Sequence, residues 1–204
     1  IRHSFNLGEE EVRVKRALEL ASAGRNVALI SSGDAGIYGM AALVFEILND
    51  SAPTTWERIE IIVEPGISAF QAAAARAGAP LGHDFCAISL SDLMTPWSVI
   101  EKRLQAAASA DFVVALYNPA SKKRRIGLKI AAEIFNKARP SSCPVVIARE
   151  LGRPNEEVIF TTLEKFKPET VDMLTIIIIG AKNTRLYNNE IGSHMYTPRG
   201  YIEI

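Results

Sequence analysis

The stretch Ser31-Ser32-Gly33-Asp34-Ala35-Gly36-Ile37-Tyr38-Gly39-Met40 decides how the fold is read. It follows the apolar run 26–30 and precedes a helical pattern at 41–48. This order of strand, glycine-rich turn and helix is the usual ligand position in an α/β protein. The glycine spacing differs from the phosphate-binding fingerprints, and Asp34 would repel a phosphate. The turn therefore favours a neutral or cationic ligand, or it is a tight turn in which Asp34 caps the helix.

Helical and strand patterns alternate along the rest of the chain, and the Val/Ile-rich runs indicate sheets covered on both faces. The patterns predict an α/β fold. We expect a short helical turn at 163–166 and a polar surface loop at 187–192. The predicted helices are 9–23, 41–48, 69–77, 97–109 and 126–138. The predicted strands are 27–30, 59–63, 85–90, 112–117, 145–148, 158–162 and 174–179.

A polar loop, Leu81-Gly82-His83-Asp84, separates two groups of strand–helix units and predicts two domains, 1–84 and 85–204. The 204 residues carry a formal net charge of zero, which gives no support for a nucleic-acid-binding surface or an anionic-membrane anchor. The two cysteines lack metal or redox spacing and are interpreted as buried free thiols. No signal peptide and no run long enough to cross a bilayer is visible, so we expect a cytoplasmic protein.

Familiar catalytic signatures are missing from the sequence. There is no His-Glu-x-x-His, no Gly-x-Ser-x-Gly and no His/Cys cluster at metal spacing, so we predict no metal site. His3, His83 and His194 lie at loops or termini and are expected to be solvated, with only His83 near a candidate cleft mouth. The pair Glu156-Glu157 sits in a predicted turn between strands, where a solvated role is expected.

Two segments beyond the first turn suit a binding site. The strand end at Tyr117 leads into Lys122, Lys123, Arg124 and Arg125, directly before a helix. Cations at a helix start oppose the helix dipole, so the cluster suits a polyanionic ligand or is an exposed basic face. The second segment, residues 148–158, leaves a strand through a loop with Gly152 and returns as a strand, which suits a site wall.

Several motifs together resemble the tetrapyrrole (corrin) methyltransferases that use S-adenosylmethionine. The motifs occur in family order through nearly the whole chain. They are Ser32 to Met40, Glu64-Pro65-Gly66-Ile67-Ser68-Ala69, the link 81–93, Leu116-Tyr117-Asn118-Pro119 with Ser121-Lys122 and Arg124, and the tail 196–201. The segment after Tyr117 and the tail are most similar to the branch that methylates C-17 of a corrin precursor and contracts its ring. The branch includes enzymes for cobalt-free and for cobalt-containing substrates.

The resemblance implies two α/β domains with the active site in a trough between them. It implies S-adenosylmethionine as cofactor, S-adenosylhomocysteine as product and a tetrapyrrole with many carboxylates as substrate. It implies cofactor contacts at Gly33, Asp34, Ile37, Tyr38, Ser68, Ala69, Tyr117, Gly152, Leu174 and Thr175. It also gives Lys122, Lys123, Arg124 and Arg125 a carboxylate-bearing partner. Family members are typically homodimers, and no residue stands out as the acid or base for ring contraction.

Two features depart from the family pattern. Members begin with a strand and a Gly-x-Gly-Pro-Gly loop ahead of the position of Ile1, so the first strand and loop are expected to be missing from this chain. A protein without that loop is expected to be inactive. Ala35 stands where the family usually has proline, which makes the turn less preorganised but keeps its backbone hydrogen bonds.

Two other functions fit the same residues. One is a methylase of the same superfamily acting on another corrin position or on a non-corrin substrate such as diphthine or ribosomal RNA. The other is a non-catalytic small-molecule-binding protein with this fold. The segment 117–125 favours the C-17 branch over the first, and a preceding Gly-x-Gly-Pro-Gly loop would favour an enzyme over the second.

Overall fold

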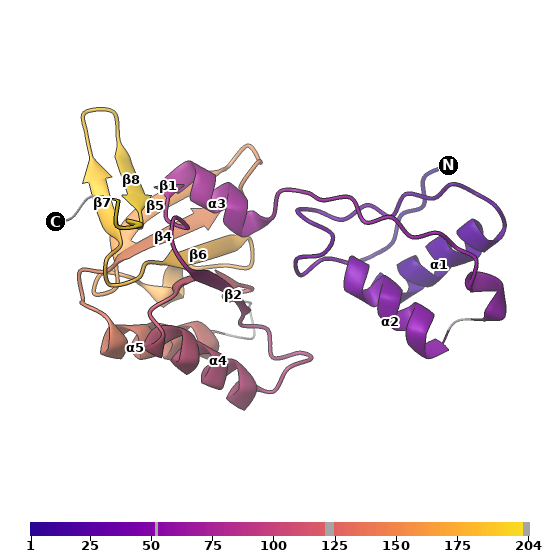
Figure 1. The fold of residues 1–204 in the computed structure, drawn as a ribbon, viewed down its shortest axis with the longest axis horizontal. Helices are drawn as coiled ribbons and strands as arrows, with labels where there is room; N and C mark the ends of the chain where they lie inside the picture. The colour runs from indigo at the N-terminus through magenta and orange to yellow at the C-terminus, as the bar shows by residue number, and fades with distance from the viewer. Residues whose placement is uncertain (52, 121–124, 202–204) are drawn as a thin grey trace. The chain divides into compact units, whose positions relative to one another are not determined.

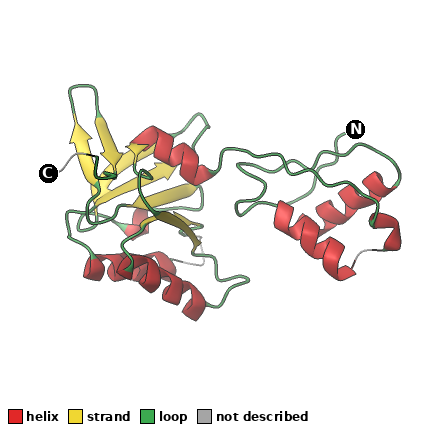
Figure 2. Ribbon diagram, in the orientation of Figure 1, coloured by secondary structure: helices red, strands yellow, loops and turns green. Residues whose placement is uncertain are grey.

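The computed structural model describes residues 1–51, 53–120 and 125–201, which belong to two compact units, Ile1–Ser68 and Ala69–Ile204 (Figures 1 and 2). Residues 69–84 pack with the second unit, because α3 (Ala69–Ala77) contacts strands of its sheets. The units thus divide at Ser68. A domain boundary after Asp84 stays a prediction.

The first unit is built from two helices, α1 (Glu10–Ser22) and α2 (Ala41–Ser51), and the short 3-10 helix η1 (Thr54–Trp56). Its core joins apolar side chains one helical turn apart on α1 and α2 with Trp56. The buried members are Val14, Leu18, Val44, Ile47 and Trp56. Helix α1 ends where Gly24, at φ +80°, adopts the left-handed conformation that glycine favours after a helix.

The strands predicted at 27–30 and 59–63 are wrong for this structure, in which neither segment is assigned as a strand. Their apolar pattern is real, since Leu29, Ile59 and Ile61 pack against the core of the first unit. A strand also needs a hydrogen-bonded neighbour, and within the described residues neither segment pairs with another strand. The apolar pattern therefore correctly indicated two segments that pack against a core. It could not indicate whether either segment has a neighbouring strand to pair with.

The second unit contains a five-stranded mixed sheet in the order β2-β3-β6-β4-β5. Strand β2 pairs in parallel with β3, whereas β6 is antiparallel to both of its neighbours, β3 and β4. Strands β2, β3 and β4 therefore run in one direction and end at the same edge of the sheet. The strands are β2 (Phe85–Ser89), β3 (Val113–Tyr117), β4 (Pro144–Arg149), β5 (Glu157–Thr162) and β6 (Thr175–Ile179).

Helices cover both faces of this sheet, as the Val/Ile-rich strands predicted (Figure 1). Helix α3 packs against β6, β4 and β5, while α4 (Trp97–Ser109) and α5 (Ile126–Ala138) pack together on the other face. Every residue of β6 is buried, as expected for a central strand covered on both sides. The predicted α/β class is confirmed, and the starts and ends of α3, α4 and α5 match the predicted ranges.

A smaller sheet follows, in the order β1-β8-β7. It consists of β1 (Gly78–Ala79), β7 (Arg185–Asn188) and β8 (Ser193–Tyr196). The loop predicted at 187–192 is therefore wrong at its start, because Tyr187 and Asn188 belong to a hairpin strand. The sequence of this strand lacks the apolar pattern that predicts a strand, because Leu186 is its only half-buried residue. The segment 163–166 is a single hydrogen-bonded turn, and the 3-10 helix η2 (Pro168–Thr170) follows it.

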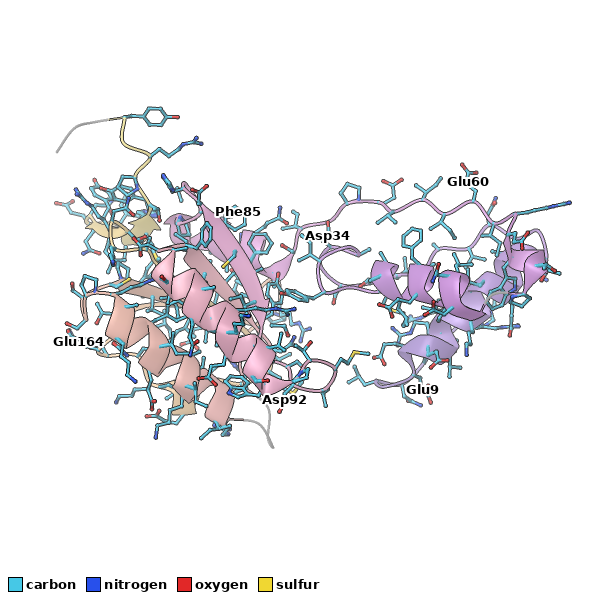
Figure 3. All side chains as sticks on the ribbon, turned by 60° about the horizontal axis from the view of Figure 1, so that its bottom comes forward. Glu9, Asp34, Glu60, Phe85, Asp92 and Glu164 are labelled. Carbon is cyan, nitrogen blue, oxygen red and sulfur yellow. The ribbon has the colours of Figure 1, made fainter. Side chains whose placement is uncertain are left out.

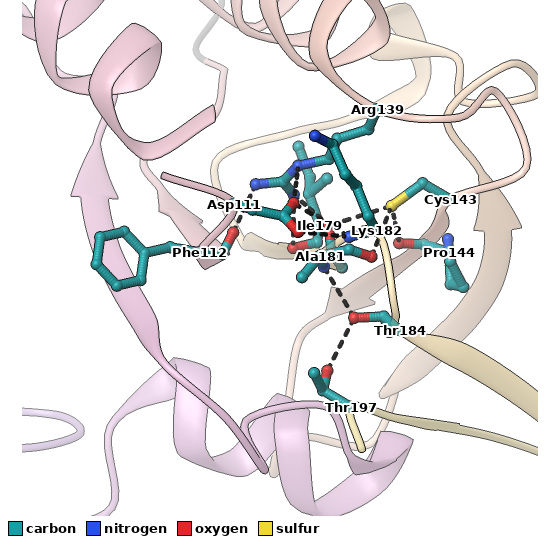
Figure 4. A network of polar contacts seen from close by, with 11 residues as sticks. Asp111, Phe112, Arg139, Cys143, Pro144, Ile179, Ala181, Lys182, Thr184 and Thr197 are labelled. Atoms are coloured by element: carbon teal, nitrogen blue, oxygen red, sulfur yellow. Dashed lines mark hydrogen bonds and ion pairs between the residues drawn. The ribbon is translucent and has the colours of Figure 1, made fainter. Parts of the chain in front are cut away.

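Arg139 ties the end of α5 to the sheet (Figure 4). Its side chain is fully buried; the guanidinium donates to the carbonyl oxygens of Phe112 and Gly180 and lies 3.6 Å from the Asp111 carboxylate. Cys143 lies in the same network, and burial raises the pKa of its thiol to about 11. Both cysteines are free; Cys143 is buried and Cys86 is half-buried. These thiols are therefore protonated and poor nucleophiles at neutral pH.

Candidate functional site: two glycine turns and a sheet edge

The Asp34 turn is joined to a second turn by the carboxylate of Asp34 itself, which lies in the loop ahead of α2 (Figure 3). One oxygen accepts the backbone N–H of Gly66 at 2.9 Å, and the other accepts that of Gly36 at 2.8 Å. These bonds, the one from Gly66 first, hold the pKa of Asp34 below its usual range. Asp34 therefore fixes two turns and does not cap α2, which begins at Ala41.

Two of the glycines are needed because another part of the backbone lies too close to them to leave room for a side chain. A Cβ on Gly66 would collide with the carbonyl oxygen of Gly33, and one on Gly39 would lie 2.5 Å from that of Ala35. Gly33 has φ +77°, which disfavours other residues, and a Cβ there would lie 3.7 Å from the backbone of Ser68. The structure thus brings the predicted cofactor contacts Gly33, Asp34 and Ser68 together around two touching turns.

The other predicted contacts of this unit lie on the same turn. Tyr38 has φ +52° and is exposed, Ile37 is half-buried, and Ser68 is 2% exposed. A groove of about 540 Å³ runs beside the turn and is lined by helices α1 and α2 and by the segments 27–31 and 59–66. Gly33 lines this groove, whereas Asp34, Ile37, Tyr38 and Ser68 do not.

In the second unit, the predicted contacts gather where β2, β3 and β4 end and β6 begins. Ligands of α/β proteins bind at the carboxyl ends of parallel strands, which favours this edge as a site. Tyr117 ends β3, Gly152 follows β4, Leu174 directly precedes β6, and Thr175 opens β6. Asn118, at φ +50°, donates its side-chain amide to Ser89 Oγ at 3.0 Å and so ties the ends of β3 and β2 together.

Tyr117 holds the beginning of α3. Its hydroxyl accepts the backbone N–H of Phe70 at 3.1 Å, and its ring meets the Phe70 ring edge-on with centroids 6.4 Å apart. Phe70 is the second residue of α3, so its N–H has no acceptor within the helix. Because Ala69 directly precedes Phe70, Tyr117 also fixes the position of Ala69, another predicted cofactor contact.

Asp172 fixes the start of β6. Its carboxylate accepts the Leu174 N–H at 3.0 Å, the Thr175 hydroxyl at 2.8 Å and Arg149 Nε at 2.7 Å. Partial burial opposes its ionisation, but these bonds, the one from Arg149 first, outweigh burial and lower the pKa of Asp172. Sequence reasoning missed Asp172; its place two residues before a buried strand, where an acid commonly bonds the backbone ahead, was the available signal.

The predicted substrate cluster is described only at its end, because Lys122, Lys123 and Arg124 lie outside the described residues. Arg125 donates to the carbonyl oxygen of Glu169 at 2.9 Å, which joins the start of α5 to η2. His83 is half exposed and bonds only its neighbour Asp84 among the described residues. The described ranges contain no group of three or more His, Cys, Asp or Glu that could hold a metal ion. They also contain no helix long and apolar enough to span a membrane.

The fold and these motifs define a methylase of one family: the chain belongs to the tetrapyrrole (corrin/porphyrin) methylases, whose family model matches residues 2–167. A precorrin-3B C(17)-methyltransferase of Sinorhizobium sp. is 45% identical over 202 residues, covering 98% of this chain and 79% of the relative. A probable cobalt-factor III C(17)-methyltransferase of Salmonella typhimurium is 48% identical, covering 93% and 75%. The crystal structure of the methyltransferase CobJ superposes with a TM-score of 0.85 at 41% identity, covering 93% of this chain and 77% of that one.

Proposed function

We propose that the protein transfers a methyl group from S-adenosylmethionine to C-17 of a corrin precursor, precorrin-3B or cobalt-factor III, with ring contraction, in cobalamin biosynthesis. The observation that carries the proposal is the identity of 45–48% to relatives named for this reaction, over 93% or more of the chain. The segment from Tyr117 to Asn118 and Pro119, which resembles the C-17 branch, supports it.

The proposed cofactor contacts are the ten residues of the two turns and the sheet edge: Gly33, Asp34, Ile37, Tyr38, Ser68, Ala69, Tyr117, Gly152, Leu174 and Thr175. The charges present fit a cofactor that carries a sulfonium and an ammonium group. Two acids near it are held ionised: Asp34, which is itself a proposed contact, and Asp172, which lies two residues before the proposed contact Leu174. The glycines let a ligand approach the backbone closely.

The proposed reaction is an in-line displacement. A nucleophilic carbon of the macrocycle forms a bond to the methyl carbon while the sulfur–methyl bond breaks, and its electron pair stays on sulfur to give S-adenosylhomocysteine. The sulfonium supplies the activation of the methyl group. The protein's residues would contribute alignment of the two reactants and exclusion of water.

The substrate's carboxylates are proposed to bind Lys122, Lys123, Arg124 and Arg125. Arg125 already bonds the Glu169 carbonyl, so its share of this role would be smaller than that of the other three. We further propose a cytoplasmic enzyme that acts as a homodimer, by its resemblance to the family.

The test is mass spectrometry of precorrin-3B and of cobalt-factor III incubated with methyl-labelled cofactor and a full-length version of the protein that includes the Gly-x-Gly-Pro-Gly loop. One labelled methyl group at C-17 is expected, and no label transfer to either substrate would refute the proposal. Calorimetric titration of the same full-length version with S-adenosylhomocysteine tests the cofactor site separately. Asp34→Arg should abolish binding, and equal affinity in variant and parent would remove this turn from the site.

A further inference from the structure

Glu156 uses its two carboxylate oxygens to join two separate parts of the second unit. Oε2 accepts the backbone N–H of Gly152 at 2.6 Å, and Oε1 accepts Arg76 Nε of helix α3, also at 2.6 Å. Its neighbour Glu157 opens β5 opposite Arg149 and is exposed, and within the described part of the chain its side chain forms no hydrogen bond or ion pair, although its charge helps raise the pKa of Arg149. The two adjacent glutamates therefore differ sharply, although the sequence suggests the same solvated role for both.

The loop that Glu156 holds contains two residues with a left-handed backbone conformation. Glu150 and Gly152 have φ of +51° and +74°, and the Glu150 N–H donates to the Leu174 carbonyl oxygen at 3.0 Å. A Cβ on Gly152 would meet nothing within 4 Å, so space beside this residue is open to a ligand. Because Glu156 occupies the Gly152 N–H, the carbonyl and the open Cα face of Gly152 remain for that ligand.

Helix α3 links this loop to the end of β3. At its start, the Phe70 N–H is held by the Tyr117 hydroxyl; near its end, Arg76 is held by Glu156. Three proposed cofactor contacts, Ala69, Tyr117 and Gly152, are thereby connected through one rigid element of nine residues.

We propose that Glu156 is a positioning residue for the cofactor, which sets the Gly152 loop through its backbone bond and fixes that loop to α3 through Arg76. The inference rests on the proposed function, since it presumes that Gly152 lines the cofactor. An exposed ion pair alone would contribute little. The bond from the Gly152 N–H gives Glu156 a second, directional partner, and with Arg76 it holds the pKa of this carboxyl below its usual range.

The test compares Glu156→Ala, Glu156→Gln and Arg76→Met with Glu157→Ala as the matched control. Calorimetry measures the dissociation constant of S-adenosylhomocysteine, and steady-state kinetics measures KM for cofactor and for tetrapyrrole. Glu156→Ala should weaken S-adenosylhomocysteine binding by about tenfold and raise the cofactor KM, with the tetrapyrrole KM within about twofold of the parent. Glu156→Gln keeps an oxygen for the Gly152 N–H and loses the charge facing Arg76, so Glu156→Gln and Arg76→Met should both give intermediate losses. Glu157→Ala should bind like the parent.

The outcomes separate this inference from the proposed function. A parent protein that fails to bind S-adenosylhomocysteine refutes the cofactor site itself. A parent that binds it, with Glu156→Ala within about twofold, overturns the role of Glu156 and leaves the proposed function standing. If Glu156→Ala does not fold, Glu156→Gln and Arg76→Met decide, and parent-like affinity in both would overturn the inference.

Discussion

Gly66→Ala should destabilise the first unit, because the added Cβ has no room. Built on the present backbone, it would collide with the carbonyl oxygen of Gly33 and lie 3.3 Å from Asp34 Cα. Both obstacles are backbone atoms, so no side chain can rotate away. The turns would have to separate, which would strain the bond from the Gly66 N–H to Asp34.

The expected cost is about 1–3 kcal/mol of unfolding free energy, the usual range for overpacking at a closely packed site. Gly36→Ala is the matched control in the same turn. Its Cβ would meet only the end of the Asp34 side chain, at 3.3 Å, and its φ is not in the left-handed region. Gly36→Ala should therefore lower the unfolding free energy by less than about 1 kcal/mol. Alanine also reduces the entropy of the unfolded chain, which offsets part of this cost.

Urea unfolding followed by tryptophan fluorescence measures this effect. The chain has two tryptophans, and Trp56 lies in the core of the first unit while Trp97 opens α4. In a Trp97→Phe background, Trp56 reports on the first unit alone. S-adenosylhomocysteine affinity should fall by about tenfold or more in Gly66→Ala. An unfolding midpoint equal to that of the parent would refute the close approach of the two turns.

Three further outcomes are expected. The pKa of Asp34 is lowered in the folded state, so the ionised Asp34 should stabilise the first unit above its ordinary pKa of 3.8, and this stabilisation should be lost as the pH falls below that value. Trp56 fluorescence should show the loss in the parent and not in Asp34→Asn. Ala35→Pro should raise the stability of the first unit by about 0.4–1 kcal/mol, because within the described residues the Ala35 N–H donates no hydrogen bond; a lowered urea midpoint would contradict it. Replacing Lys122 and Arg124 by alanine should raise the tetrapyrrole KM, reduce its salt sensitivity and leave cofactor affinity unchanged; an unaltered tetrapyrrole KM at low salt would show that the cluster is only a solvated face.

Sequence patterns predicted helices well and strands unevenly. The predicted ranges of α3, α4 and α5 match because local apolar periodicity and flanking Gly or Pro residues define a helix within its own segment. The five strands of the larger sheet were also found, because their apolar residues mark segments that are buried in this sheet. The strands β1, β7 and β8 of the smaller sheet were not predicted, since β1 has only two residues and β7 is mostly exposed. The runs 27–30 and 59–63 failed because a strand requires a partner that no local pattern reveals.

The site was predicted at the level of its turns, and its supporting contacts were not. Glycine spacing and strand ends located Gly33, Tyr117 and Gly152, because turn chemistry is local. The bond between Asp34 and Gly66 joins residues 32 positions apart, and the bond between Arg76 and Glu156 joins residues 80 apart. One sequence holds no signal for contacts of this range, so Glu156 looked like an ordinary surface residue.

The acids of the proposed site share one physical role. Asp34, Glu156 and Asp172 each accept the N–H of a loop backbone, from Gly66, Gly152 and Leu174 respectively. These backbone bonds are the main cause of the lowered pKa of Asp34 and Glu156, whereas burial opposes the ionisation of Asp172 and the bonds from Arg149, Thr175 and then Leu174 lower its pKa. Each carboxyl group therefore stays ionised at neutral pH and is a poor proton donor. Fixed anions beside loops that present backbone suit a cationic cofactor and a displacement that needs alignment more than proton transfer. The proton transfers of ring contraction would then be carried out by other groups. Substitution of these acids by amides should therefore weaken cofactor binding more than it slows the ring contraction that follows methylation.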